Sequence, residues 1–236
     1  MATNLSSLTA IGFDADDTLW ENEQIYRLTE ERFAGLLAPH TAIENVSHRL
    51  LEAEKRNLRL YGFGIKGFTL SMIETAIEVT AGRVPATVIR EILDSGRDML
   101  RHPVETLPHV TKTLEKLAGS YRLIMITKGD LFDQERKLAQ SGLGDLFDAV
   151  EIVSDKTPAT YERVFTRYGD GPERSMMVGN SLKSDVLPAI EAGSWGVHVP
   201  HVLTWALEHA EPPASEPRFR QLEHLGELMD LIAQIS

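Results

Sequence analysis

Short apolar segments separated by longer amphipathic stretches form the dominant pattern along this chain. Five of these segments are almost continuously apolar and are bounded by polar or glycine-rich positions: 9–13, 122–126, 149–153, 175–178 and 195–199. Continuous apolar strands with helices between them are typical of a parallel sheet that is covered on both faces. The pattern therefore predicts an α/β fold with a doubly wound parallel sheet.

A long helical block lies between the first two predicted strands. Residues 21–102 show helical periodicity throughout, and the main internal break is the glycine-rich segment 61–68. A block of about 80 residues is too long for an ordinary crossover between strands. We therefore predict a core domain of residues 1–20 and 103–236, into which residues 21–102 are inserted as a helical cap domain. A last amphipathic stretch, 221–235, predicts a closing helix.

Composition narrows the classes of function. The 236 residues carry a net charge of −11 and include no cysteine. The acidic balance argues against nucleic acid or an acidic membrane as a partner, and the lack of cysteine excludes disulfides and thiolate chemistry. Residues 1–9 have no secretory pattern, and no apolar run approaches the roughly 18 residues that span a bilayer. We therefore expect a cytoplasmic monomer or homodimer.

Carboxylates follow directly after the first predicted strand. Asp14 and Asp16 are two residues apart and can face the same way, at the strand end where open α/β sheets bind ligands. Two converging carboxylates repel each other unless a cation or a shared proton intervenes. The segment therefore predicts a magnesium site with a nucleophilic or acid–base role. Alternatively, residues 16–18, Asp-Asp-Thr, supply ordinary turn and helix-cap chemistry.

The second predicted strand ends in Thr127, Lys128, Gly129 and Asp130. These residues offer a hydroxyl, a cation and a flexible backbone just before a helix N-terminus, which binds phosphate through its free amides and its dipole. The alternative is a threonine that closes a strand and an aspartate that caps a helix. Both interpretations stay open on the sequence alone.

The next two strand ends also carry polar groups. Lys156 follows the third strand and can neutralise an anion beside the carboxylates, although most lysines are solvated surface residues. Gly179 ends the fourth strand and permits close approach of the backbone, and Asn180 and Asp185 supply oxygen ligands that suit magnesium. Alternatively, Gly-Asn-Ser forms a turn, and Asp185 or its neighbour Ser184 caps the next helix.

These four signals, in this order at successive strand ends, resemble the haloacid dehalogenase-like superfamily, whose core is Rossmann-like. The resemblance covers nearly the whole chain, and the position of the helical block resembles the subfamily with small α-helical caps. Within that group the chain is similar to phosphatases of small phosphomonoesters. One departure concerns Asn180, because most such phosphatases have aspartate there. We expect this change to weaken metal affinity and to leave the chemistry intact.

The resemblance implies a magnesium-dependent phosphomonoester hydrolase that acts through an aspartyl-phosphate intermediate. Its substrate would be a small phosphorylated metabolite: a nucleotide, flavin mononucleotide or a sugar phosphate. Asp14 would be the nucleophile and a metal ligand, and Asp16 would be the general acid and base and would bind the metal through its carbonyl. The remaining phosphate-binding and metal-binding groups that the resemblance implies are Thr127, Lys156, the segment at Lys128 and Gly129, Asn180 and Asp185.

The cap would provide substrate selectivity. In segment 61–68, Tyr61 and Phe63 can stack on a ring and Lys66 can meet a second anion, although the aromatic residues can equally well pack between helices. The sequence leaves two alternative functions open: a 2-haloacid dehalogenase-type hydrolase and a non-catalytic binder of a phosphorylated ligand. Asp16 disfavours the former, because those dehalogenases lack an acid at this position and use no magnesium. Asn180 alone supports the binder.

Overall fold

A computed structural model describes residues 8–42, 45–213 and 215–235. Internal contacts divide the chain into two compact units, which we term the core unit and the helical unit. The core unit comprises Met1–Glu23, Val104–Lys128 and Gln134–Ser236, and the helical unit comprises Gln24–Pro103 and Gly129–Asp133. Whether the predicted insert folds as a domain in its own right stays a prediction.

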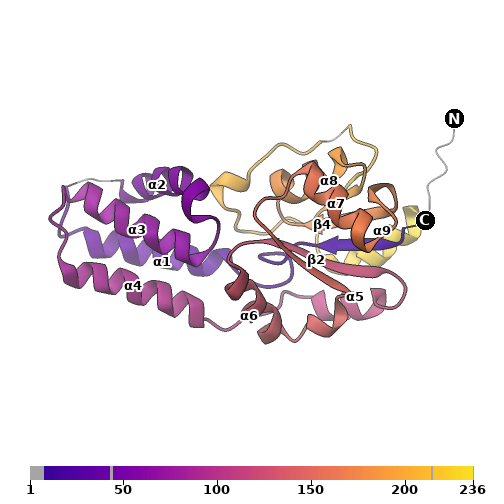
Figure 1. The fold of residues 1–236 in the computed structure, drawn as a ribbon, viewed down its shortest axis with the longest axis horizontal. Coiled ribbons are helices and arrows are strands. Elements are labelled where there is room, and N and C mark those ends of the chain that lie inside the picture. Colours follow the sequence, from indigo (N-terminus) through magenta and orange to yellow (C-terminus); the bar gives the residue numbers. More distant parts are fainter. Residues whose placement is uncertain (1–7, 43–44, 214, 236) are drawn as a thin grey trace. The chain divides into compact units, whose positions relative to one another are not determined.

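The core unit is built on a parallel sheet (Figure 1). In the described residues its strand order is β3-β2-β1-β4-β5-β6. The strands are β1 (Ala10–Phe13), β2 (Arg122–Lys128), β3 (Ala149–Val153), β4 (Ser175–Gly179), β5 (Trp195–His198) and β6 (Phe219–Gln221). The predicted α/β class with a doubly wound parallel sheet is confirmed.

Successive residues of the central strands pack on opposite faces of the sheet. Ile11 and Phe13 belong to the same apolar cluster as α5 (Val110–Leu117) and α9 (Leu228–Ile235). The intervening positions pack instead against α7 (Pro158–Tyr168), and α8 (Leu187–Glu191) lies on that face as well. Gly12 is required there, because an added Cβ would lie 3.1 Å from Phe165 Cζ and 2.9 Å from Ile126 Cδ1. The chain thus buries both faces of one sheet.

The end of the chain differs from the prediction. Residues 221–235 were expected to form one helix, but α9 begins only at Leu228 and Gln221 belongs to strand β6. Strand β6 is short and polar, and it pairs with β5 through the register Gly196↔Phe219. An edge strand of this kind is held by backbone hydrogen bonds, so its side chains need not follow an apolar pattern.

The helical unit contains helices and no strand within its described residues, as predicted. Its buried cluster includes Phe33, Leu50, Met72 and Ile92, each from a different helix. The break between the second and third helices is shorter than the predicted segment 61–68, because the second helix ends at Tyr61 and the third begins at Ile65. The helices are α1 (Glu23–Leu37), α2 (Val46–Tyr61), α3 (Ile65–Val79) and α4 (Ala86–Arg101).

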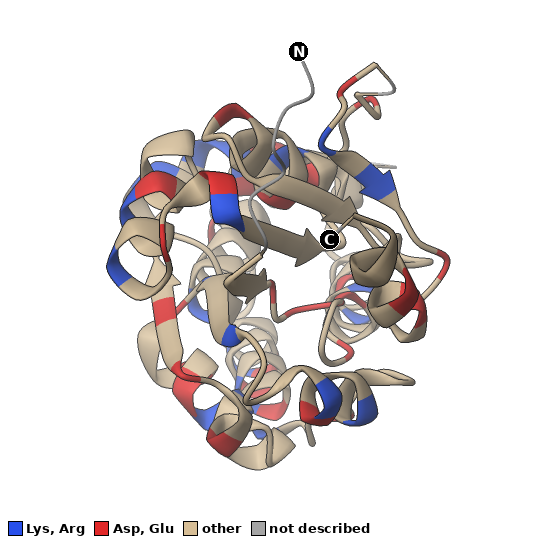
Figure 2. Ribbon diagram, turned by 90° about the vertical axis from the view of Figure 1, so that its right-hand side faces the viewer, with Lys and Arg blue, Asp and Glu red and all other residues tan. Residues whose placement is uncertain are grey.

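Acidic and basic residues are intermixed along the helices, as the ribbon colours in Figure 2 show. In the part of the chain that the structure describes, no helix is both long enough and apolar enough to cross a membrane. The prediction that residues 1–9 carry no secretory signal falls mostly on residues 1–7, which lie outside the described residues.

Candidate active site

The strand register brings the predicted site residues of β1, β2 and β4 to one edge of the sheet. Phe13, the last residue of β1, pairs with Met125 on β2 and with Val178 on β4. Asp14 continues this alignment, because its N–H donates to Val178 O at 2.9 Å. Thr127 lies two residues beyond Met125, so it and Asp14 both follow the paired stretch. This is the carboxyl edge, where sheets of this class bind their ligands.

Lys156 joins two of the predicted carboxylates. Its Nζ donates to Asp14 Oδ1 and, at 2.7 Å, to Asp185 Oδ1. Lys156 is 5% exposed, Asp14 is 7% and Asp185 is 1%, so all three are buried. Lys156 precedes Thr157, whose side chain caps α7 by accepting from Thr160 N. The alternative of a solvated surface lysine is therefore wrong.

Burial and the neighbouring charges shift the pKa values of Asp14 and Lys156. Burial, followed by the charge of Asp185, raises the pKa of Asp14 to about 7, although Lys156 opposes the shift. Burial alone would lower the pKa of Lys156, but the charges of Asp14 and Asp185 outweigh it and raise that pKa. Lys156 is therefore a permanent cation, which neutralises only one of the two carboxylates beside it.

Thr18 links the end of β1 to the end of β4. Its Oγ1 lies within donating distance of Asp14 Oδ2, at 3.1 Å, and of Asn180 Oδ1, at 3.3 Å. The same Oγ1 accepts from Asn180 N at 3.0 Å. Asp14 Oδ2 and Asn180 Oδ1 thus both lie close to the Thr18 hydroxyl. The carboxylates of Asp14 and Asp185 carry more negative charge than Lys156 neutralises. Oxygen ligands of this type and charge are those that Mg²⁺ prefers, so the donor set fits this ion.

Asp185 is positioned by a π-helical turn, Leu182–Val186. Its Oδ2 accepts from Ser181 N at 2.9 Å, and Ser181 caps the turn by accepting from Ser184 N. The carboxylate lies so close to Gly179 that an added Cβ there would overlap Asp185 Oδ2. The glycine is therefore needed for the carboxylate to reach its place. Ser184 and Asp185, the alternative helix caps, lie inside the turn, and Ser181 is the cap.

Asp16 has different partners from Asp14. Its Oδ1 accepts from Trp20 Nε1 at 2.7 Å and from Lys137 Nζ at 2.9 Å, and its Oδ2 accepts from Gln134 Nε2 at 2.8 Å. Burial would raise the pKa of Asp16, but the charge of Lys137 and these three hydrogen bonds outweigh it and lower the pKa. Asp16 is therefore an ionised carboxylate in this arrangement.

Thr127 and Lys128 both lie at the carboxyl end of β2. Thr127 is 1% exposed, and its Oγ1 donates to Lys128 O at 3.2 Å. The Lys128 ammonium donates to Ser184 Oγ at 2.8 Å and to Glu208 Oε1 at 2.7 Å. Gly129 follows with φ +130°, a value that side-chain-bearing residues rarely adopt, so it allows the chain to turn.

Glu208 closes a partly buried polar network that the sequence did not reveal. Besides Lys128, it accepts from Ser181 Oγ at 2.5 Å and from Ser184 Oγ. Burial would raise the pKa of Glu208, but the charge of Lys128 and these hydrogen bonds lower it to about 2. The network ties the segment that follows β5 to the π-helical turn that carries Asp185.

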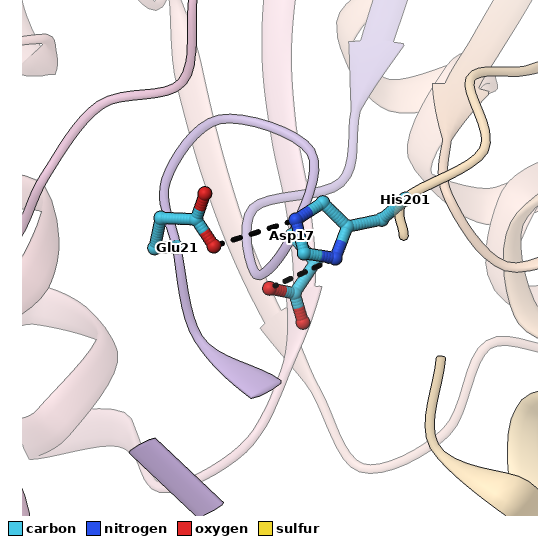
Figure 3. A group of neighbouring side chains, drawn as sticks. All are labelled: Asp17, Glu21 and His201. Carbon is cyan, nitrogen blue, oxygen red and sulfur yellow. Dashed lines mark ion pairs between the residues drawn. The ribbon is translucent and has the colours of Figure 1, made fainter. Parts of the chain in front are cut away.

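Asp17, Glu21 and His201 form a second polar group, which Figure 3 shows. His201 Nδ1 lies 3.6 Å from Asp17 Oδ1, and His201 Nε2 lies 3.3 Å from Glu21 Oε2. One atom from each residue meets the spacing of a cation site, 4.8 Å or less. Asp17 already accepts the backbone N–H groups of Asn22 and Glu23. The imidazole thus lies between two carboxylates, with one ring nitrogen toward each.

The predicted substrate-binding residues of segment 61–68 belong to the helical unit. There the Tyr61 hydroxyl donates to Glu74 Oε1 at 2.5 Å. Lys66 Nζ donates to both carboxylate oxygens of Asp130 at 2.9 Å. Asp130 also accepts from Asp133 N, as expected of a helix cap, at the start of α6 (Leu131–Ser141). Substrate binding by Tyr61, Phe63 and Lys66 stays a prediction.

The structure thus brings together Asp14, Lys156, Asn180 and Asp185, with Thr127 at the same sheet edge. Several residues of the site were not predicted, because their partners are distant in the sequence. Thr18 lies in the first motif, so the sequence offered a local signal for it, whereas the other residues carried none. The residues that were missed are Thr18, Gln134, Lys137, His201 and Glu208.

Comparison with known proteins gives a consistent result. The family described as haloacid dehalogenase-like hydrolase matches residues 8–193. A glyceraldehyde 3-phosphate phosphatase of Methanothermobacter thermautotrophicus is 28% identical over 217 residues, which cover 86% of this chain and 91% of the relative. The N-acylneuraminate-9-phosphatase of Mus musculus is 25% identical over 209 residues, covering 80% and 81%.

Solved structures show the same relationship. A haloacid dehalogenase-like family hydrolase from Xanthomonas campestris is 42% identical, covers 100% of this chain and 96% of its own, and has a TM-score of 0.86. The L-2-haloacid dehalogenase from Xanthobacter autotrophicus is 20% identical, covers 97% and 100%, and has a TM-score of 0.67, so it shares the fold. Given the family match over most of its length, the chain belongs to the haloacid dehalogenase-like hydrolases.

Proposed function

We propose that this chain is a magnesium-dependent phosphomonoester hydrolase that acts on a small phosphorylated metabolite through an aspartyl-phosphate intermediate. One observation carries the proposal: the buried Asp14 carboxylate lies between the Lys156 ammonium and the Thr18 hydroxyl. A carboxylate held in this way is oriented as a nucleophile, and a cation beside it can bind the oxygens of a phosphate group. The two phosphatases among the relatives support the same class of reaction.

Asp14 performs the first displacement. Its carboxylate attacks phosphorus in line, the carboxylate–phosphorus bond forms and the substrate alcohol departs. Water then hydrolyses the acyl phosphate and regenerates Asp14. Lys156, Thr127 and the backbone amides at Lys128 and Gly129 bind the phosphoryl oxygens, over which negative charge spreads in the transition state.

The metal ligands we propose are Asp14, Asn180, Asp185 and the backbone carbonyl of Asp16. When bound, Mg²⁺ offsets the repulsion between the attacking carboxylate and the phosphate. Asn180 contributes a neutral oxygen instead of a carboxylate, so we expect weaker affinity than in a site with aspartate at this position.

Asp16 is the general acid and base. Because it is ionised in the free site, it first takes up a proton, which it gives to the departing alkoxide; the carboxylate so formed then takes a proton from the hydrolytic water. General acid–base help of this kind is typically worth about 10²–10⁴-fold in rate. A 2-haloacid dehalogenase needs no such proton, because a halide leaves as a stable anion. Asp16 therefore favours phosphoryl transfer over the dehalogenase alternative.

The test is phosphate release from p-nitrophenyl phosphate with and without Mg²⁺. We expect wild-type turnover that a chelator abolishes, no turnover by Asp14→Asn, and a loss of about a hundredfold or more for Asp16→Ala, which lacks the base for hydrolysis of the intermediate. Asp145→Asn, an exposed position, is the matched control and should behave as wild type. Turnover by purified Asp14→Asn would refute the nucleophile. A folded wild type that binds phosphate but releases none from any substrate would support the non-catalytic binder.

The substrate class can be narrowed with a panel of phosphorylated metabolites. Nucleotides, flavin mononucleotide and sugar phosphates belong in it. Glyceraldehyde 3-phosphate and N-acylneuraminate 9-phosphate join them because the names of the two relatives refer to these compounds. We propose that the helical unit selects among them, through Tyr61, Phe63 and Lys66.

A further inference from the structure

We infer that Gln134 and Lys137 are positioning residues for Asp16, which they hold in the orientation that proton transfer to the leaving alcohol requires. The inference rests on the proposed function, in which Asp16 is the general acid. Both residues lie on α6, one helical turn apart, so their side chains emerge on the same side of the helix.

The two residues restrain both oxygen atoms of Asp16. Lys137 donates to Oδ1 at 2.9 Å and Gln134 donates to Oδ2 at 2.8 Å. Trp20 Nε1 also donates to Oδ1, and with donors on both oxygen atoms the carboxylate plane cannot rotate without breaking a hydrogen bond. Gln134 is 2% exposed and Lys137 is 6% exposed, so water does not readily replace either donor. Gln134 and Lys137 therefore fix the torsion angle that orients the Asp16 carboxylate.

The amide of Gln134 supports this interpretation. Its Nε2 donates to Asp16 Oδ2 and also to Lys128 O at 3.0 Å, so it bridges the ends of β1 and β2. Reversing the amide would place its oxygen against two acceptors, so the orientation is fixed. Its Oε1 is buried and has no hydrogen-bond partner within the described part of the chain. A buried acceptor without a partner is costly, and its retention points to a functional role for the bridge.

Lys137 links Asp16 to the segment that leads into α1. The same Nζ donates to Asn22 Oδ1 at 2.8 Å, and Asn22 N donates to Asp17 Oδ1 at 2.8 Å. Asp17 adopts φ +61°, so the turn beside Asp16 is itself constrained. One ammonium group thus sets the position of Asp16 relative to this turn.

The test compares two leaving groups. An alkoxide needs a proton as it departs, whereas p-nitrophenolate is a stable anion and departs without one. The ratio kcat/KM reports the steps up to departure of the alcohol and is independent of later hydrolysis of the intermediate. Lys137 and Gln134 also stabilise the ionised carboxylate, so removing either donor favours the protonated acid, and a loss in kcat/KM can come only from lost orientation. We expect Lys137→Met and Gln134→Leu to lower kcat/KM at least tenfold more for the best alkyl phosphate than for p-nitrophenyl phosphate. Lys137→Arg, which retains a cationic donor, should restore part of the loss.

Lys116→Met, at an exposed position of α5, is the matched control and should change neither value. Thermal unfolding shows whether each variant is folded, and Gln134→Leu with Lys137→Arg provides the test if Lys137→Met is not. Equal losses on both substrates, or no loss, would overturn the inference while the proposed function stands. A wild type that hydrolyses neither substrate would overturn the proposed function and the inference together.

Discussion

The two oxygen atoms of Asp14 have different partners. Oδ1 accepts from Lys156, and Oδ2 lies against the Thr18 hydroxyl. Each partner leads to another part of the site, since Lys156 contacts Asp185 and Thr18 contacts Asn180. The geometry of the nucleophile therefore depends on residues more than 100 positions away, which a local motif cannot reveal.

Asn180→Asp should tighten magnesium binding. The substitution adds a carboxylate beside Asp14, where an added negative charge strengthens the attraction to a divalent cation. We expect the dissociation constant to fall on the order of tenfold, measured by isothermal titration calorimetry. Gln140→Glu, at an exposed position of α6, makes the same change in net charge and should leave the affinity unaltered. Unchanged or weaker affinity in Asn180→Asp would show that Asn180 is not a ligand.

The position of the segment between β4 and α8 depends on Gly179 and on the hydrogen bonds of Glu208. Gly179 makes room for the Asp185 carboxylate, and Glu208 holds Ser181 and Ser184 from the segment after β5. The sequence pointed to this strand end through its polar residues. It did not point to Glu208, because a glutamate 23 residues beyond Asp185 resembles any surface residue.

Gly179→Ala should disable the site. The added Cβ displaces Asp185 Oδ2, so we expect phosphatase activity to fall by at least a hundredfold and the free energy of unfolding to fall by about 1–3 kcal/mol, as for other overpacked positions. Activity assays and chemical denaturation measure the two effects. Gly35→Ala on α1, where an added Cβ meets nothing within 4 Å, is the matched control. Full activity in Gly179→Ala would mean that Asp185 is not needed where it lies.

Glu208→Gln should destabilise the protein in a pH-dependent way. The pKa of Glu208 is lowered from 4.5 to about 2, so its ionised form stabilises the fold above pH 4.5, and this contribution is lost as the pH falls toward 2. We expect the free energy of unfolding of the wild type to exceed that of the variant by on the order of 2 kcal/mol at neutral pH. This difference should shrink near pH 3. Denaturation of both proteins at several pH values measures it. Glu115→Gln on α5 should show no such trend, and a constant difference for Glu208→Gln would contradict the network.

At the scale of the whole molecule, much of the core could be predicted from apolar runs. Strands β1, β2, β4 and β5 are apolar because both faces of the sheet are buried along them, whereas β3 is a partly exposed edge strand. The ends of all five strands lie within two residues of the prediction. Strand order has no local signal, and β6 has no apolar pattern. Likewise, the chemistry of Asp14 was visible in its motif, whereas the donors to Asp16 were not. Gln134 and Lys137 become partners of Asp16 only when α6 packs beside β1.

Substitutions in the helical unit should alter selectivity and leave the core chemistry intact. We expect Phe63→Ala and Lys66→Ala to change the relative kcat/KM values across the substrate panel, because they remove a stacking surface and a cation from the proposed specificity segment. Turnover of p-nitrophenyl phosphate should change less. Lys55→Ala on α2, which removes an exposed ion pair with Glu52, is the control. An unaltered profile would assign the segment to packing alone.

The π-helical turn that carries Asp185 holds one residue more than an α-helical turn would. Shortening Leu182–Val186 by a single residue would regularise the coil and swing the following side chains by roughly 100° about its axis. Asp185 would then no longer lie over Gly179, although every residue type needed for the site would still be present. The number of residues in this turn is thus a determinant of the site, and insertions or deletions there should be far less tolerated than substitution of Lys183, its exposed residue.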